Sequence, residues 1–175
     1  MAIDIGLAAV ADGNNFSATY TYIQLDNPAN ATGTITQVQV YADISITGMR
    51  AGTFYNTGAN TYKCRASAAL GDAPADQVTT FPGLSIAVVA GDFIGGYHGT
   101  GYMELTVDAT KSFIYVSGEF IDADDETTYS APIGRHIALY GTGVEAGWTG
   151  TINLVVNPAK VNLIAKANIA SINGI

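Results

Sequence analysis

Four carboxylate side chains crowd into residues 122–126 of this chain. Asp122, Asp124, Asp125 and Glu126 are interrupted only by Ala123, and Ca²⁺ prefers oxygen ligands of this kind on a loop. These four residues are the candidate cation site, and Ca²⁺ is the only cofactor that the sequence suggests. The run lacks the glycine and the twelve-residue spacing of an EF-hand loop. A solvated hairpin tip whose charges repel one another is the competing interpretation.

A second candidate site is aromatic. Residues 97–102 have the sequence Tyr-His-Gly-Thr-Gly-Tyr, which places an imidazole between two phenol rings in a glycine-rich stretch. Aromatic faces stack on sugars, and polar side chains bind their hydroxyl groups. Tyr97, His98 and Tyr102 are therefore candidate glycan contacts. The same residues equally fit a loop that joins two strands.

Histidine metal-ligand spacing and the motifs of nucleophilic catalysis and phosphate binding are missing from the sequence. His98 and His136 are not spaced as metal ligands, and no G-x-S-x-G elbow, Walker loop or dinucleotide fingerprint occurs. Cys64 is the single cysteine, which excludes an intrachain disulfide and is typical of a small buried hydrophobe. We expect a protein that is not an enzyme, although two carboxylates facing across a glycan hydrolase cleft leave no signature in a sequence.

The composition of the chain limits the classes of partner that it can bind. The 15 acidic and 7 basic residues give a net charge of -8 without any Lys/Arg cluster, which argues against nucleic acid. Charged residues are only 13% of the chain, as in surfaces that other protein covers, or in a Thr- and Asn-rich extracellular domain. No basic segment precedes the apolar N-terminal run, and no run has the length of a membrane span. We expect a protein made in the cytoplasm.

Short segments of alternating polarity indicate β-strands. They include residues 20–25 and 34–41, a hairpin of residues 52–55 and 61–65, and residues 84–89, 92–97, 112–117 and 136–140. Residues 66–77 are predicted to form a loop, and Asp92 is predicted to cap a tight reversal. Seven or eight strands without a convincing helix predict an all-β fold, an antiparallel jelly-roll-like β-sandwich of residues 1–143.

Residues 144–175 are predicted to form a C-terminal strand or extended arm. Residues 163–168 and 168–173 repeat a short apolar and polar phrase, which favours extended structure over an amphipathic helix. The arm is expected to bind a neighbour through its apolar residues Val161, Leu163, Ile164, Ile169, Ile172 and Ile175. A last strand of the same domain with a frayed end is the alternative.

Distinctive phrases occur along nearly the whole chain: MAIDIG at residues 1–6, NPANATG at 27–33, GTFY at 52–55, YKCR at 62–65, VVAGDFIG at 88–95 and ANIASING at 167–174. In these phrases the chain resembles a group of tailed-bacteriophage virion proteins. The resemblance implies a head-decoration, minor capsid or tail-associated subunit, located in the virion, with copies of itself and other virion proteins as partners. A carbohydrate-binding module of a receptor-binding fibre is the alternative.

Overall fold

The computed structural model describes residues 2–147, and these residues form strands without any helix. Every pairing between the strands of this part is antiparallel, which confirms the predicted all-β fold. No helix of these residues is long and apolar enough to cross a membrane. The strands are β1 (Ala2–Gly6), β2 (Asn15–Ser17), β3 (Tyr20–Gln24), β4 (Gly33–Gly58), β5 (Thr61–Ala73), β6 (Gln77–Val88), β7 (Phe93–Tyr97), β8 (Thr100–Val107), β9 (Phe113–Ser117), β10 (Glu126–Thr128), β11 (Arg135–Ile137) and β12 (Leu139–Glu145).

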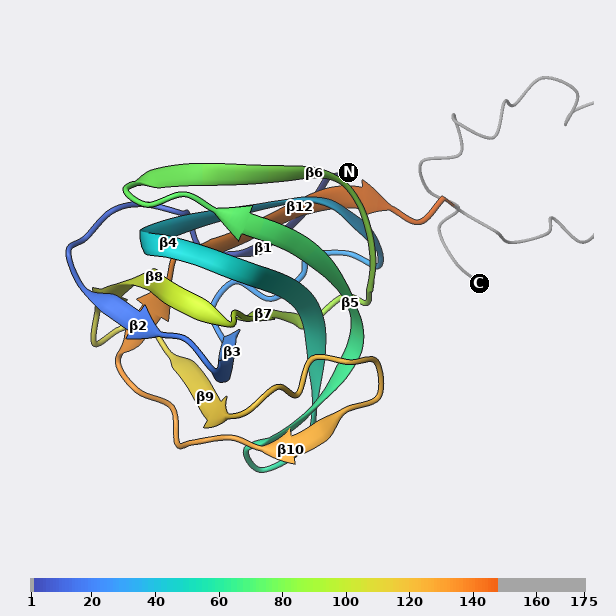
Figure 1. Ribbon diagram of the computed structural model, residues 1–175. Coiled ribbons are helices and arrows are strands. Elements are labelled where there is room, and N and C mark those ends of the chain that lie inside the picture. The colour runs from blue at the N-terminus through green and yellow to red at the C-terminus, as the bar shows by residue number, and fades with distance from the viewer. Residues whose placement is uncertain (1, 148–175) are drawn as a thin grey trace, which may run out of the picture.

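Strand β4 organises the sheet because its 26 residues belong to both halves of it. Its first half pairs with β12 and β6, and its second half pairs with β7 and β5. Between the halves, register shifts and the left-handed backbone of Gly48 (φ 66°) interrupt the ladder, and such bulges bend a strand. The sheet therefore curls into a half-barrel (Figure 1). Strands that pass from one sheet to the other through a bulge or bend form the corners of β-sandwiches, so the shared strand agrees with the predicted sandwich-like fold.

The concave side of the curled sheet holds the core. A large cluster includes Ile3, Ile35, Val38 and Leu139, and a smaller one contains Ile23, Phe54, Tyr62, Cys64, Ile114, Ile121 and Tyr129. Cys64 is buried, as predicted. Burial raises the pKa of its thiol to about 12, so the sulfur remains a protonated, unreactive packing group.

Two predicted reversals are confirmed. The hairpin joins β4 to β5, although the strands extend further than expected and only Ala59 and Asn60 separate them. At the end of β6, Asp92 Oδ2 accepts a hydrogen bond of 2.8 Å from Val89 N, while Asp92 N donates to Val89 O at 2.9 Å. Gly91 supplies the positive φ of 92° that this turn requires.

The predicted loop at residues 66–77 is wrong. Strand β5 continues to Ala73, and β6 begins at Gln77. Alanine has little intrinsic preference for strands, but pairing with residues of β4 overrides that preference here. Strand β12 reaches Glu145, two residues past the predicted domain boundary at residue 143. Nearly all of the predicted arm, residues 148–175, lies outside the described residues.

Candidate functional site

The four carboxylates of residues 122–126 do not converge. Each has a different partner: Asp122 Oδ1 lies 2.6 Å from Arg50 Nη2, Asp124 Oδ1 lies 2.9 Å from Lys63 Nζ, Asp125 Oδ2 accepts from Asp122 N at 3.0 Å, and Glu126 Oε1 accepts from the Thr57 hydroxyl at 2.6 Å. Within residues 2–147 no three His, Cys, Asp or Glu side chains are grouped so that they could hold a metal ion. The predicted cation site is not formed.

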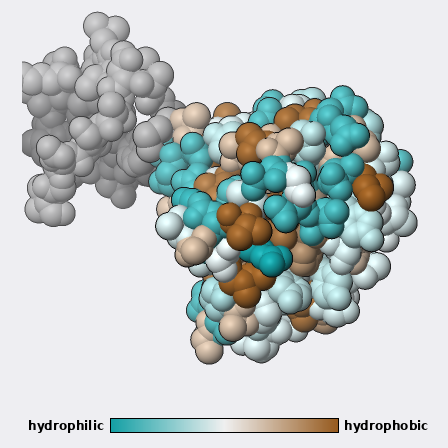
Figure 2. Space-filling model, turned by 90° about the vertical axis from the view of Figure 1, so that its left-hand side faces the viewer, coloured by the Kyte–Doolittle hydropathy of each residue, from teal (hydrophilic) through white to brown (hydrophobic). Residues whose placement is uncertain are grey.

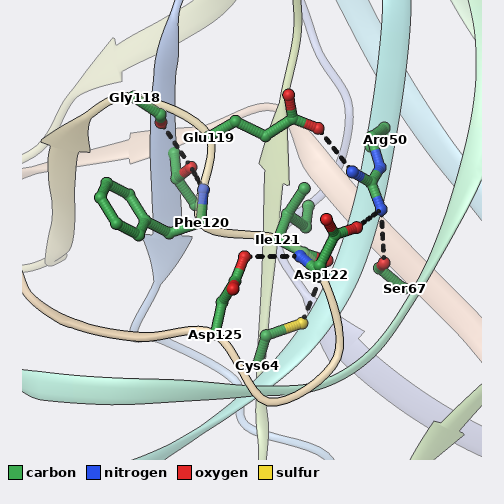
Figure 3. Close-up of polar contacts among 10 residues, drawn as sticks. Arg50, Cys64, Ser67, Gly118, Glu119, Phe120, Ile121, Asp122 and Asp125 are labelled. Carbon is green, nitrogen blue, oxygen red and sulfur yellow. Dashed lines mark hydrogen bonds and ion pairs between the residues drawn. The ribbon is translucent and has the colours of Figure 1, made fainter.

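These carboxylates instead lie in the loop between β9 and β10 and, for Glu126, at the start of β10; this loop is held against β4 and β5 by polar contacts (Figure 3). Arg50 on β4 binds Glu119, Asp122 and the Ser67 hydroxyl. Below it, the Cys64 thiol donates to Ile121 O at 3.3 Å, and the Ile121 side chain is fully buried. Residues 118–126, which we call the closing loop, are held by side chains of β4 and β5.

The predicted glycan contacts are not brought together, and His98 requires a correction. Its side chain is completely buried, with Nδ1 3.5 Å from the Tyr22 hydroxyl. Burial lowers the pKa of His98 to about 4, so the imidazole is neutral and inaccessible to a sugar. Tyr97 packs partly buried against the smaller core cluster, whereas Tyr102 is exposed opposite Ile44.

The buried acidic groups have structural partners. Asp92 forms two contacts with Arg65, from Nε at 2.6 Å and from Nη2 at 3.0 Å, and the Arg65 guanidinium lies over the Tyr55 ring. Glu104 Oε1 accepts hydrogen bonds from the backbone amides of Asp12 and Asn14 at 2.8 and 3.1 Å. These carboxylates fix a turn and an N-terminal loop, and sequence reasoning identified only the first of them.

An aromatic group that the sequence did not single out surrounds Phe16. Its ring lies 5.3 to 5.6 Å from those of Tyr20, Tyr22, Phe113 and Tyr115. Phe16, Tyr20 and Tyr115 are half-buried, so part of this group faces solvent. The alternating aromatic residues of β3 and β9 were the available signal, but the contribution of Phe16 depends on tertiary packing.

At two edges of the sheet, side chains or loops form hydrogen bonds with the outer backbone groups. Along β1, Asp4 N donates to Asn30 Oδ1 at 3.0 Å, and Asn27 Nδ2 donates to Gly6 O at 2.9 Å. Beside β9, Ser130 N donates to Tyr115 O at 2.9 Å. Side chains or loops thus occupy main-chain groups that an added strand would otherwise use.

A third margin lacks such a cover. Residues 66–73 of β5 and the whole of β6 pair with β4 on one side and with no strand of the described chain on the other. We call residues 66–88 the open edge; in Figure 1 it follows the green strands at the top. Apolar side chains on the face shown in Figure 2 occur singly or in small groups among polar ones. The open edge is therefore the more distinctive binding feature.

Comparison with known proteins does not place the chain in a family. No family model matches the sequence, and no curated protein sequence matches it significantly. The functional argument therefore depends on the edges, the loops and the aromatic group of this structure.

Proposed function

We propose that this chain is a non-enzymatic structural subunit of a bacteriophage virion and acts through protein–protein assembly. The head-decoration, minor capsid and tail-associated positions all fit this function. The open edge is the observation that carries the proposal, because an uncovered strand margin is a ready template for pairing with another chain. Natural proteins usually cover such margins, as this chain does along β1.

Two sequence features support the same function. The low content of charged residues, 13%, suits a surface that other protein covers. The apolar residues of the C-terminal segment could add to a neighbouring sheet, and the phrases shared with tailed-phage virion proteins favour a particle component. The buried Asp92 and Glu104 support backbone structure, which fits a scaffold better than a catalyst.

Deletion of residues 157–175 tests the proposal. We expect the shortened chain to keep the circular dichroism and thermal unfolding of the full chain, since it retains every strand from β1 to β12. It should lose self-association in analytical ultracentrifugation and incorporation into particles. Normal incorporation of the shortened chain would contradict an assembly role for this segment.

The aromatic group around Phe16 favours a second function, a carbohydrate-binding module of a receptor-binding fibre. Its half-exposed Tyr20 and Tyr115 rings lie 5.6 Å apart, edge to face, and aromatic faces bind sugars by stacking. A glycan array should then show binding that Tyr20→Ala abolishes and Tyr97→Ala leaves intact. An array without specific binding would remove this alternative.

A further inference from the structure

The contacts and the strand regularity of the open edge differ along its length. At its C-terminal end, Thr53 Oγ1 donates to Ala87 O at 2.7 Å, and Arg65 binds Asp92 in the turn after β6. These contacts tie the end of β6 to β4 and β5. In its middle, Pro82 pairs with Gln37 and Ile86 with Ile35, so residues 83–85 form a bulge.

Within β6, regular strand without a second partner in the described chain therefore remains at residues 77–81. Val78 is 44% exposed there, and its backbone partner on β4 is Tyr41. Every second residue of an edge strand points its N–H and C=O groups away from the sheet. An added strand can bind this stretch without displacing any contact of the described chain.

We propose that residues 161–169 of a neighbouring copy add to β6 at residues 77–81 as an extra strand; this assignment rests on the proposed assembly function. Positions 161, 163, 165, 167 and 169 are all apolar, with Asn162, Lys166 and Asn168 between them. Such a period of two places one apolar and one mainly polar face on a strand.

Charge favours this occupant. All 15 acidic residues lie within residues 2–147, whereas residues 148–175 contain Lys160 and Lys166 and no acidic residue. The open edge carries the exposed Asp72 and Asp76 and no basic residue. Complementary charge aligns the two surfaces and disfavours pairing of two open edges with each other.

The exit of the described chain determines which strands residues 161–169 can reach. Ala146 N donates to Thr32 O, and Thr32 Oγ1 accepts from Ala90 N in the turn that follows β6. The described chain thus leaves the body beside the tied end of β6, while residues 77–81 lie at the opposite end. Residues 148–160 span at most about 45 Å when extended, which is enough to reach residues 77–81 of the same chain or of an adjacent subunit. Donation by a neighbour therefore rests on the proposed assembly function.

Cysteine cross-linking in the full-length chain tests the pairing. Chains with Val78→Cys are mixed with chains carrying Leu163→Cys, Ala165→Cys or Ala167→Cys and are then oxidised. A disulfide needs Cβ atoms about 4 Å apart, so we expect a cross-linked dimer with at least one tail variant. Val144→Cys, at a site 58% exposed on β12, is the matched control, and its yield should be about tenfold lower. Equal yields would overturn the assignment.

A second set of variants separates this inference from the proposed function. Val78→Lys should weaken self-association about tenfold. A lysine on an edge strand disfavours pairing with another strand, and this one would also repel Lys160 and Lys166. Val107→Lys, at a site 59% exposed, should leave it unchanged. One outcome is that deletion of residues 157–175 abolishes assembly while Val78→Lys does not weaken it. That result would support the proposed assembly function and would show that the C-terminal segment does not bind at residues 77–81. A disulfide within one chain of the Val78→Cys/Ala165→Cys variant would overturn donation by a neighbour.

If the full-length chain neither self-associates nor joins particles, the proposed function and this assignment fall together.

Discussion

The closing loop packs against the β4–β5 hairpin, and the open edge begins on the same hairpin and continues along β6. The two regions nevertheless satisfy their polar groups in different ways. Around the closing loop, Arg50 binds two carboxylates, Cys64 binds Ile121 O, and the Thr21 hydroxyl bonds to Gly118 O and Phe120 N. Along the open edge, side chains are mostly alanine, threonine and other apolar groups, and the backbone groups that face away from β4 lack a strand partner within the described residues. Polar side chains are concentrated where the chain must close on itself.

Replacing the buried anchor of the closing loop should have the largest effect on stability. Ile121→Ala is expected to lower the free energy of unfolding by about 4 kcal/mol, because a fully buried side chain is lost and a cavity remains. Val78→Ala on the open edge should cost less than about 0.5 kcal/mol. Urea denaturation measures both, and equal losses would show that the open edge is packed as firmly as the closing loop.

The pH dependence of stability should depend mainly on His98. This residue joins the closed side, since Thr19 N donates to His98 O and Gly118 N donates to Thr19 O. Its folded pKa, lowered from 6.5 to about 4, means that the unfolded chain takes up the proton first as pH falls. His98 should thus cost about 3 kcal/mol of stability between pH 6.5 and pH 4.

His98→Leu should flatten this pH profile. His136→Asn is the control. Burial lowers the pKa of His136 as well, but this side chain is only half-buried, so its replacement should change the slope less than His98→Leu does. Denaturation midpoints at pH 7, 5.5 and 4.5 give the comparison. A slope that persists in His98→Leu would assign the effect to other groups.

Removal of the Arg50 side chain should have an intermediate effect. Arg50→Ala is expected to lower stability by about 2 kcal/mol, because Glu119, Asp122 and Ser67 lose one shared donor. Lys63→Ala should leave the thermal midpoint unchanged, since its partner Asp124 is mainly exposed. Similar midpoint shifts in the two variants would reduce the Arg50 contacts to ordinary surface ion pairs.

Thiol labelling sharpens the same contrast without altering stability. Native Cys64 should resist a thiol reagent, since it is buried and its pKa is raised to about 12. A cysteine introduced by Val78→Cys should react readily in the same chain, unless assembly covers it. Rapid labelling of Cys64 in the folded chain would show that the closing loop opens easily.

The sequence was sufficient where neighbouring residues determine the structure. The Asp92 turn needs only a glycine with positive φ and a side-chain acceptor three residues from Val89. The hairpin at Ala59 and Asn60 likewise follows from a short polar connection between two alternating segments. Burial of Cys64 was expected because an unpaired thiol behaves as a small hydrophobe.

Distant contacts account for the errors. The partners of Asp122 and Glu126 lie 72 and 69 residues away, at Arg50 and Thr57, so a local run of carboxylates resembled a cation site. For His98, a glycine-rich setting gave no information on whether the imidazole faces solvent or core. The assembly arm and the phage function stay predictions, because they depend on residues outside the described chain and on partners.

The shared strand β4 also constrains how this protein unfolds. The β4 backbone pairs with strands of both halves of the sheet. Neither half can therefore unfold without breaking β4 pairings on which the other half also depends. We expect hydrogen exchange to be slowest in β4 and of similar protection at both of its ends, with one cooperative transition instead of two. A single transition would mean that neither half of the sheet opens while the other stays folded.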